Sequence, residues 1–165
     1  MQDIETAPAT EIEPPSLYDW AGGAEALERL TTLFYGKVRS DPLLQPVFAQ
    51  MGEDHPRHVA RFIAEVFGGP SVYSEQHGGH AAMIHHHLNR HLQEPQRRRW
   101  VQLLLDTADE AGLPDDPEFR SAFVAYVEWG SRLAVINSQP GAEVTEDQPM
   151  PRWGWGEAKG PYVAP

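Results

Sequence analysis

The sequence predicts an all-helical, single-domain protein, and three observations support this. Apolar residues recur at spacings of three or four along several stretches of the chain, which is the period of an amphipathic helix. Glycines and prolines separate these stretches, as helix ends require. No stretch alternates between apolar and polar residues with period two, so no β-sheet is expected. With 165 residues, the chain is long enough to bury one hydrophobic core.

Two helices are expected in the first half of the chain, after an acidic, proline-bearing segment at residues 1–15 that predicts a flexible leader. The first helix follows Gly22-Gly23 and ends before Asp41-Pro42, and a short apolar piece at 43–48 comes next. The second begins near Asp54, because a proline in the first turn loses no needed hydrogen bond. Their inward-facing residues are Leu27, Leu30, Phe34 and Val38 in the first, and Val59, Phe62, Ile63 and Val66 in the second.

Two more helices are expected in the second half. After the stop at Gly68-Gly69-Pro70, the glycines of the next segment argue against regular structure until about Ala81. Pro95 opens a helix that ends at Gly112-Leu113-Pro114, and the last helix runs to about Asn137. Their expected inward residues are Val101, Leu104, Leu105 and Ala108, followed by Phe119, Phe123, Tyr126, Gly130, Leu133 and Ile136.

The C-terminal extension, residues 139–165, is polar and rich in proline and glycine, yet it contains PRWGWG and Tyr162. Its composition is typical of a flexible tail. Two closely spaced tryptophans instead favour a tail that docks on its own domain or on a partner. The residues leave both interpretations open.

Composition excludes several classes of function. The net charge of −11 argues against nucleic acid or an anionic membrane as partner. The one basic run, Arg97-Arg98-Arg99, is interpreted as the solvated face of a helix. The absence of cysteine excludes thiolate metal sites and covalent haem attachment. No secretory signal or membrane span is apparent, so we expect a cytoplasmic protein, either a monomer or a homodimer.

Six of the eight histidines lie within residues 77–92, and a zinc site is one interpretation of this cluster. His87 and His91 stand four apart, so on a helix they would share a face. A third ligand could come from His80, His55 or a carboxylate. However, the motif HExxH is absent, and three consecutive histidines cannot all bind one ion, because they point about 100° apart on a helix.

A haem site is the other interpretation. It needs one neutral imidazole on a helix, with apolar neighbours that exclude water. Met83, His87 and Leu92 could supply such a face. An ordinary hydrophobic core would show the same pattern.

The order of several motifs resembles the group II truncated haemoglobins over about residues 17–138. The matching stretches are LYDWAGGAEALERL, LFYGKVRSDPLLQPVF, HVARFIAEVFGGP, VYSEQ, MIHHHLNRHL and RRRWVQLLLDTADEAGLP. The resemblance implies a truncated 2-over-2 globin domain at residues 16–138, a helical sandwich around a haem, with an extension at each end.

The resemblance implies that His87 is the iron ligand. His87 lies thirteen residues before Trp100 and four after Met83, where the family places an apolar residue. Counting from Tyr73 instead leads to His86. However, the HGGH loop looks one glycine longer than is usual in the family, which supplies the extra residue, so we expect His87.

On the opposite side of the haem, Tyr35 resembles the family's distal tyrosine, and Phe48 matches an aromatic that packs on the ring. His55 lies one turn before Val59 and is expected to face the ligand, as is the Trp100 indole N–H. Ordinary core packing of the aromatics, and an exposed His55 at a helix start, are the alternatives. The remaining expected haem contacts are Val59, Phe62, Tyr73, Met83 and Leu92, with His58 and His86 near the propionates.

The resemblance implies non-covalent haem b (iron protoporphyrin IX) with five-coordinate iron that binds dioxygen, CO and NO reversibly. Nitric-oxide dioxygenase or peroxidase activity is also associated with the family, and an oxygenase would need a separate reductase. Two other functions stay open: a zinc protein that uses the histidine cluster, and an interaction module that presents the C-terminal tryptophans to a partner.

Overall fold

The computed structural model describes residues 12–161, so most of the predicted leader at residues 1–15 lies outside the described residues. It confirms the all-α prediction, because the described residues form helices and no strand. The helices are α1 (Leu17–Ala21), α2 (Gly23–Val38), α3 (His55–Val66), α4 (Val72–His77), α5 (Gly79–His87), α6 (Glu94–Glu110), α7 (Pro117–Asn137) and the short 3₁₀ turn η1 (Gly156–Ala158).

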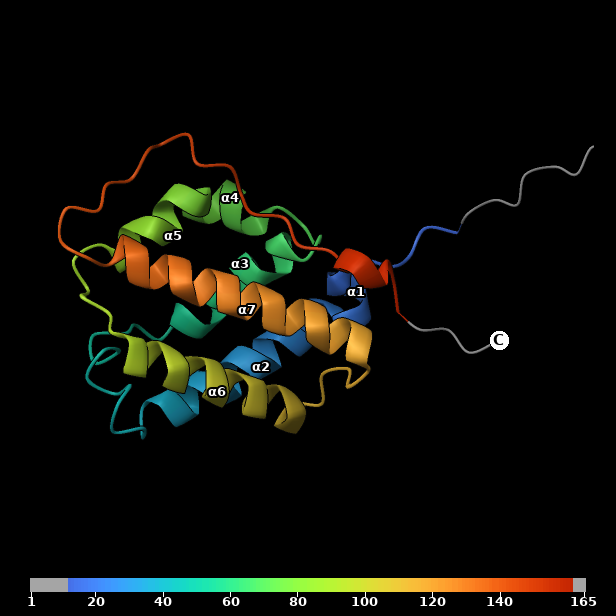
Figure 1. The fold of residues 1–165 in the computed structure, drawn as a ribbon, viewed down its shortest axis with the longest axis horizontal. Coiled ribbons are helices and arrows are strands. Elements are labelled where there is room, and N and C mark those ends of the chain that lie inside the picture. The colour runs from blue at the N-terminus through green and yellow to red at the C-terminus, as the bar shows by residue number, and fades with distance from the viewer. Residues whose placement is uncertain (1–11, 162–165) are drawn as a thin grey trace, which may run out of the picture.

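Two helix pairs form the sandwich. α2 packs against α3, α6 packs against α7, and contacts between α2 and α6 join the pairs. Figure 1 shows α7 crossing the front of the molecule, with α6 below it and α2 and α3 behind. α5 contacts the C-terminal pair through α7, and α4 links α5 to α3. Short helices therefore close one side of the sandwich.

Local chemistry sets the helix ends. The Ser16 hydroxyl accepts the Asp19 N–H at the start of α1, and the Asp116 carboxylate accepts the Phe119 N–H at the start of α7, as N-cap side chains do. Gly22 separates α1 from α2 with a φ of 106°, in the left-handed region that favours glycine. A Cβ atom at position 69 would lie 2.7 Å from the Tyr18 ring. Because Gly69 has none, the chain can pack tightly against Tyr18 after α3.

The segment before Ala81 differs from the sequence prediction. Irregular structure was expected there because of its glycines, but it contains α4 and the first turn of α5. Gly78 and Gly79 form the corner between the helices, with φ values of 86° and 67°. The glycines therefore allow a sharp change of direction between two helices and do not prevent helix formation.

The predicted face of α7 is wrong at its end, where Ile136 is 64% exposed. Ile136 lies on the outer face of the helix there, whereas Val135 and Asn137 line the cavity and Ser138 is fully buried. In α6, Leu105 is only partly buried, whereas Leu104 lies fully in the core.

The interpretation of Arg97-Arg98-Arg99 as a solvated face is also wrong for Arg97, which is 6% exposed. Its guanidinium forms ion pairs with Glu94 at 2.6 Å and Glu128 at 3.2 Å. These contacts tie the start of α6 to α7. Buried arginine needs such partners, because an unpaired charge in the interior is costly.

Residues 139–161 of the C-terminal extension run back along the helices. Figure 1 shows this segment leaving the end of α7, passing over α5 and α4, and reaching α1. Trp153 and Trp155 pack against the core. Of the two interpretations left open by the sequence, docking on its own domain is the one these contacts support. No helix within residues 12–161 is long and apolar enough to cross a membrane.

Candidate functional site

A cavity of about 510 Å³ lies between the helices, and every residue proposed from the sequence for the haem site lines it. α2, α3, α5, α6 and α7 all contribute side chains to its walls, and the linings are mostly apolar. The predicted residues found there are Tyr35, Phe48, His55, His58, Val59, Phe62, Tyr73, Met83, His86, His87, Leu92 and Trp100.

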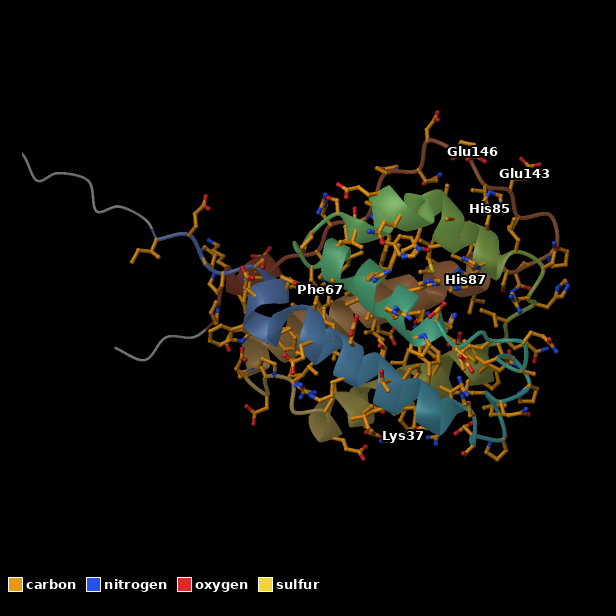
Figure 2. The ribbon with its side chains drawn as sticks, turned by 180° about the vertical axis from the view of Figure 1, so that it is seen from behind. Lys37, Phe67, His85, His87, Glu143 and Glu146 are labelled. Carbon is orange, nitrogen blue, oxygen red and sulfur yellow. The ribbon has the colours of Figure 1, made fainter. Side chains whose placement is uncertain are left out.

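His87 is the last residue of α5 and lies on the inner side of this helix, whereas His85 points outward (Figure 2). The Met83 carbonyl accepts a hydrogen bond from the His87 ring. Burial lowers the pKa of His87 to about 4 and outweighs the effect of this bond. The imidazole is therefore neutral at pH 7, with one nitrogen engaged by the backbone and the other free for a ligand.

His86 also lines the cavity but is more exposed than His87. Burial and the nearby charge of Arg90 lower its pKa. The backbone turn from His86 to His87 rotates the two imidazoles about 100° apart. Of the two candidates left by the sequence counts, His87 is thus the more buried.

The opposite wall contains a cluster of rings from α2, α3 and the segment between them. The Tyr35 ring lies 4.7 Å from the His55 ring and 5.6 Å from the Phe48 ring, both edge-on. The His55 Nε2 atom is buried without a hydrogen-bond partner in the described structure. Burial lowers the pKa of His55 to about 4, with smaller contributions from His86, His58 and His87. His55 is thus a neutral imidazole, and it is not the exposed residue of the alternative interpretation.

Trp100 of α6 completes this wall. Its ring packs edge-on against Phe34 at 5.4 Å, and its side chain is a hydrogen-bond partner of Tyr35. Burial raises the pKa of the Tyr35 phenol well above its ordinary value, so the hydroxyl keeps its proton. Tyr35 and Trp100 therefore place an O–H and an N–H group beside His55.

The rim of the cavity contains a cationic side chain that the sequence predictions missed. Arg90 lines the cavity, and its Nε atom donates to the His86 carbonyl at 3.1 Å. His58 lies on the α3 side of the rim, with its ring 4.3 Å from that of His77. The position of Arg90, three residues after His87, could have indicated this role. α7 also lines the cavity with Gly130 and Leu133, which the sequence placed on its inward face but not in the site, and with Ala134.

The zinc interpretation finds no support in the geometry. Within the part of the chain that the structure describes, no three histidine, aspartate or glutamate side chains are placed to hold one metal ion. α5 ends at His87, and His91 follows it with a φ of 52°. The expectation that His87 and His91 share a helical face is therefore wrong.

The residues of the cavity fit a haem. Apolar walls suit the porphyrin ring, and a neutral imidazole with one free nitrogen suits its iron. On the other side, the unpartnered Nε2 of buried His55 points to a polar group that the protein alone does not supply. Helices packed two over two around such a cavity define the class of haem-binding globins.

Comparison with known proteins is consistent with this class. The sequence matches the bacterial-like globin family over residues 16–128. Group 2 truncated haemoglobin YjbI of Bacillus subtilis is 33% identical over 117 residues, covering 71% of this chain and 86% of the relative. The chain belongs to the bacterial-like globin family and, within it, to the group II truncated haemoglobins. This membership implies haem-based ligand binding in general.

Solved structures share the fold. The haemoglobin of Chloroflexus aurantiacus aligns with a TM-score of 0.65 at 30% identity, covering 73% of this chain and 97% of that one. The group II truncated haemoglobin of Bacillus anthracis aligns with a TM-score of 0.68 at 23% identity, covering 79% of this chain and 98% of that one. Nearly the whole of each known chain is therefore matched, while about a quarter of this chain is additional.

Proposed function

We propose that this chain binds haem b non-covalently through His87 and takes up dioxygen, CO or NO on the opposite side. The observation that carries the proposal is a partly buried, neutral His87 on one wall of the cavity, with Tyr35, His55 and Trp100 on the other. Haem iron held by one imidazole supplies an open position for a diatomic ligand.

On the α5 wall, the chain leaves one ring nitrogen of His87 free to bind the iron. Because the Met83 carbonyl holds the His87 ring through one N–H, the second nitrogen carries the lone pair and is oriented by the helix. Leu92 and Met83 line the same cavity and add apolar surface to it. This arrangement keeps water away and leaves His87 unprotonated at pH 7.

On the opposite wall, the chain supplies hydrogen-bond donors. The Tyr35 hydroxyl and the Trp100 indole N–H are fixed among packed rings, and the His55 Nε2 lies buried beside them. Donors of this kind stabilise a ligand that gains negative charge, by about 1.5–3 kcal/mol for each charge-assisted bond. Dioxygen would therefore leave slowly, whereas CO, which gains less charge, would depend less on these residues.

At the rim, His58, His86 and Arg90 would face the haem propionates. The Arg90 guanidinium suits a carboxylate partner. Burial and Arg90 lower the pKa of His86, so this imidazole carries less charge than a free one, and Arg90 would be the main cationic partner.

Slow release of dioxygen favours redox chemistry as a second role. Converting nitric oxide and dioxygen to nitrate consumes one electron, so a separate reductase would have to supply it. Peroxide turnover would use the same polar wall. We place this protein in the cytoplasm as a monomer or homodimer.

The experiment that tests the proposal is the absorption spectrum of the full chain after addition of haemin, recorded oxidised, reduced, and reduced under CO. A Soret band that shifts on addition of CO is expected. Failure to take up haemin would refute the proposal, and the histidine cluster would then need another explanation.

A further inference from the structure

The C-terminal segment at residues 139–161, which we call the strap, lies beyond the residues that match the globin family. It nevertheless contacts the helices on both sides of the cavity. Seven of its residues, 149–155, carry most of these contacts. These contacts indicate that the role of the strap depends on which helices it docks on.

The strap is attached to the C-terminal end of α3. The Trp153 N–H donates to the Val66 carbonyl at 2.9 Å, and Arg152 donates to the Glu65 carbonyl at 3.2 Å. The last carbonyls of a helix have no partner within the helix. The strap thus gives the Val66 carbonyl its partner and adds a second donor to the Glu65 carbonyl, which also accepts the Gly68 N–H at 3.1 Å, on the helix that carries His55.

The strap is also attached to α5 through His80. The Nδ1 atom of His80 lies 3.1 Å from the Pro149 carbonyl, and the imidazole is only 9% exposed. His80 lines the cavity, and its ring lies 6.2 Å from the Phe62 ring of α3. It precedes His87 by seven residues, which places both on the same face of α5, two turns apart. A second contact joins Glu146 to His85 at 3.6 Å (Figure 2).

The tryptophans of the strap fasten it to the rest of the domain. The Trp153 ring lies 5.6 Å from both Tyr126 and Trp129 of α7. The Trp155 indole N–H donates to the Pro15 carbonyl at 2.7 Å, and its ring packs edge-on against Trp20 at 6.0 Å. Aromatic pairs at these separations add to the stabilisation from burial. The C-terminal part of the strap is thus fixed to α1, and the middle of the strap holds α5 through Pro149.

We propose that the strap is a brace that sets the position of α5 relative to α3, and that His80 and Trp153 are positioning residues for His87. α5 is short, follows a glycine corner and packs chiefly on α4 and α7. It therefore has few contacts of its own to hold it over the cavity, and the His80–Pro149 hydrogen bond supplies one. The inference about His87 rests on the proposed haem function, but the brace itself does not.

The brace can be tested without haem, by hydrogen exchange of the full chain. In His80→Leu we expect the amides of residues 79–87 to exchange about tenfold faster, because one buried hydrogen bond is lost. His80→Gln, which can still donate to the carbonyl, should restore protection. The exposed substitution Glu157→Gln in η1 is the control and should change nothing. Unchanged exchange at residues 79–87 in His80→Leu would refute the brace.

The link to His87 needs a spectroscopic readout. In the reduced haem protein, His80→Leu and Trp153→Ala should shift the iron–histidine stretching band and speed haem loss about tenfold. Trp153→Phe, which keeps an aromatic ring against α7, should restore most of both. A band identical to that of the unmodified chain, with α5 amides deprotected, would refute the positioning role and leave only a structural brace. Absence of haem uptake by the unmodified chain would instead refute the proposed function.

Discussion

The two walls of the cavity differ in how they place polar groups. The α5 wall has one neutral imidazole with a ring nitrogen free for a ligand, His87, and the hydrogen-bond partner of its other nitrogen is the backbone of the same helix. The opposite wall has three polar side chains, Tyr35, His55 and Trp100, which come from three different helices. The imidazole of one wall is thus oriented within its own helix, whereas the polar groups of the other depend on how α2, α3 and α6 pack.

This difference has a consequence for mutation. Haem binding that depends on the His87 imidazole should be lost when that group is removed. Ligand stabilisation shared among Tyr35, His55 and Trp100 should instead fall in steps as each side chain is removed. The predictions below test this contrast, from the largest expected effect to the smallest.

His87→Ala should abolish stable haem binding, because His80, which shares its face of α5, lies two turns away and is hydrogen-bonded to the Pro149 carbonyl. His86→Ala is the matched control and should leave the Soret band and its shift under CO nearly intact. Absorption spectra after addition of haemin measure both. Equal loss in the two variants would mean that the α5 wall is not organised around one residue.

Substitutions in the opposite wall should have smaller, graded effects. Tyr35→Phe and Trp100→Phe should each speed dioxygen release by about tenfold or more, since each removes a donor. Stopped-flow measurement of dioxygen dissociation gives the rates. Tyr18→Phe, which removes a hydroxyl far from the cavity, should leave the rate unchanged. If neither Tyr35→Phe nor Trp100→Phe changes it, these side chains are not ligand donors.

Acid should destabilise the haem-free chain through its neutral histidines. The pKa of His55 falls from 6.5 to about 4 on folding, so the unfolded state binds more protons between these values. His55 therefore does not lower the free energy of unfolding above about pH 6.5. As pH falls towards 4, protonation of the unfolded state lowers this free energy by about 2–3 kcal/mol for this residue. Urea denaturation at pH 7.5 and pH 4.5 measures the loss. His55→Leu should reduce it, and an equal loss in this variant would contradict the assignment.

The rim should contribute least. Arg90→Gln should speed haem loss only a few-fold, because exposed ion pairs contribute up to about 1 kcal/mol. Transfer of haem to an excess of acceptor globin gives these rates. Arg98→Gln, on the outer face of α6, serves as the control.

Much of the site could be predicted from the sequence. The spacing of His87, Met83 and Trp100, together with motifs typical of the family, led to residues that line one cavity. Arg90 was missed because its role depends on the turn that follows α5 and not on a repeating pattern. His91 was misplaced for the same reason, since α5 ends earlier than the histidine spacing suggested.

The sequence by itself determined the helical class, the periodic core faces and most helix ends, because these depend on contacts between residues a few positions apart. Tertiary structure alone decided three features. It placed helices on both sides of Gly78-Gly79, buried Arg97 between two glutamates, and docked the strap on α3 and α5. The pairing of Arg97 with Glu128 and the docking of the strap depend on partners distant in the chain, and the energies of such contacts leave no period in the sequence.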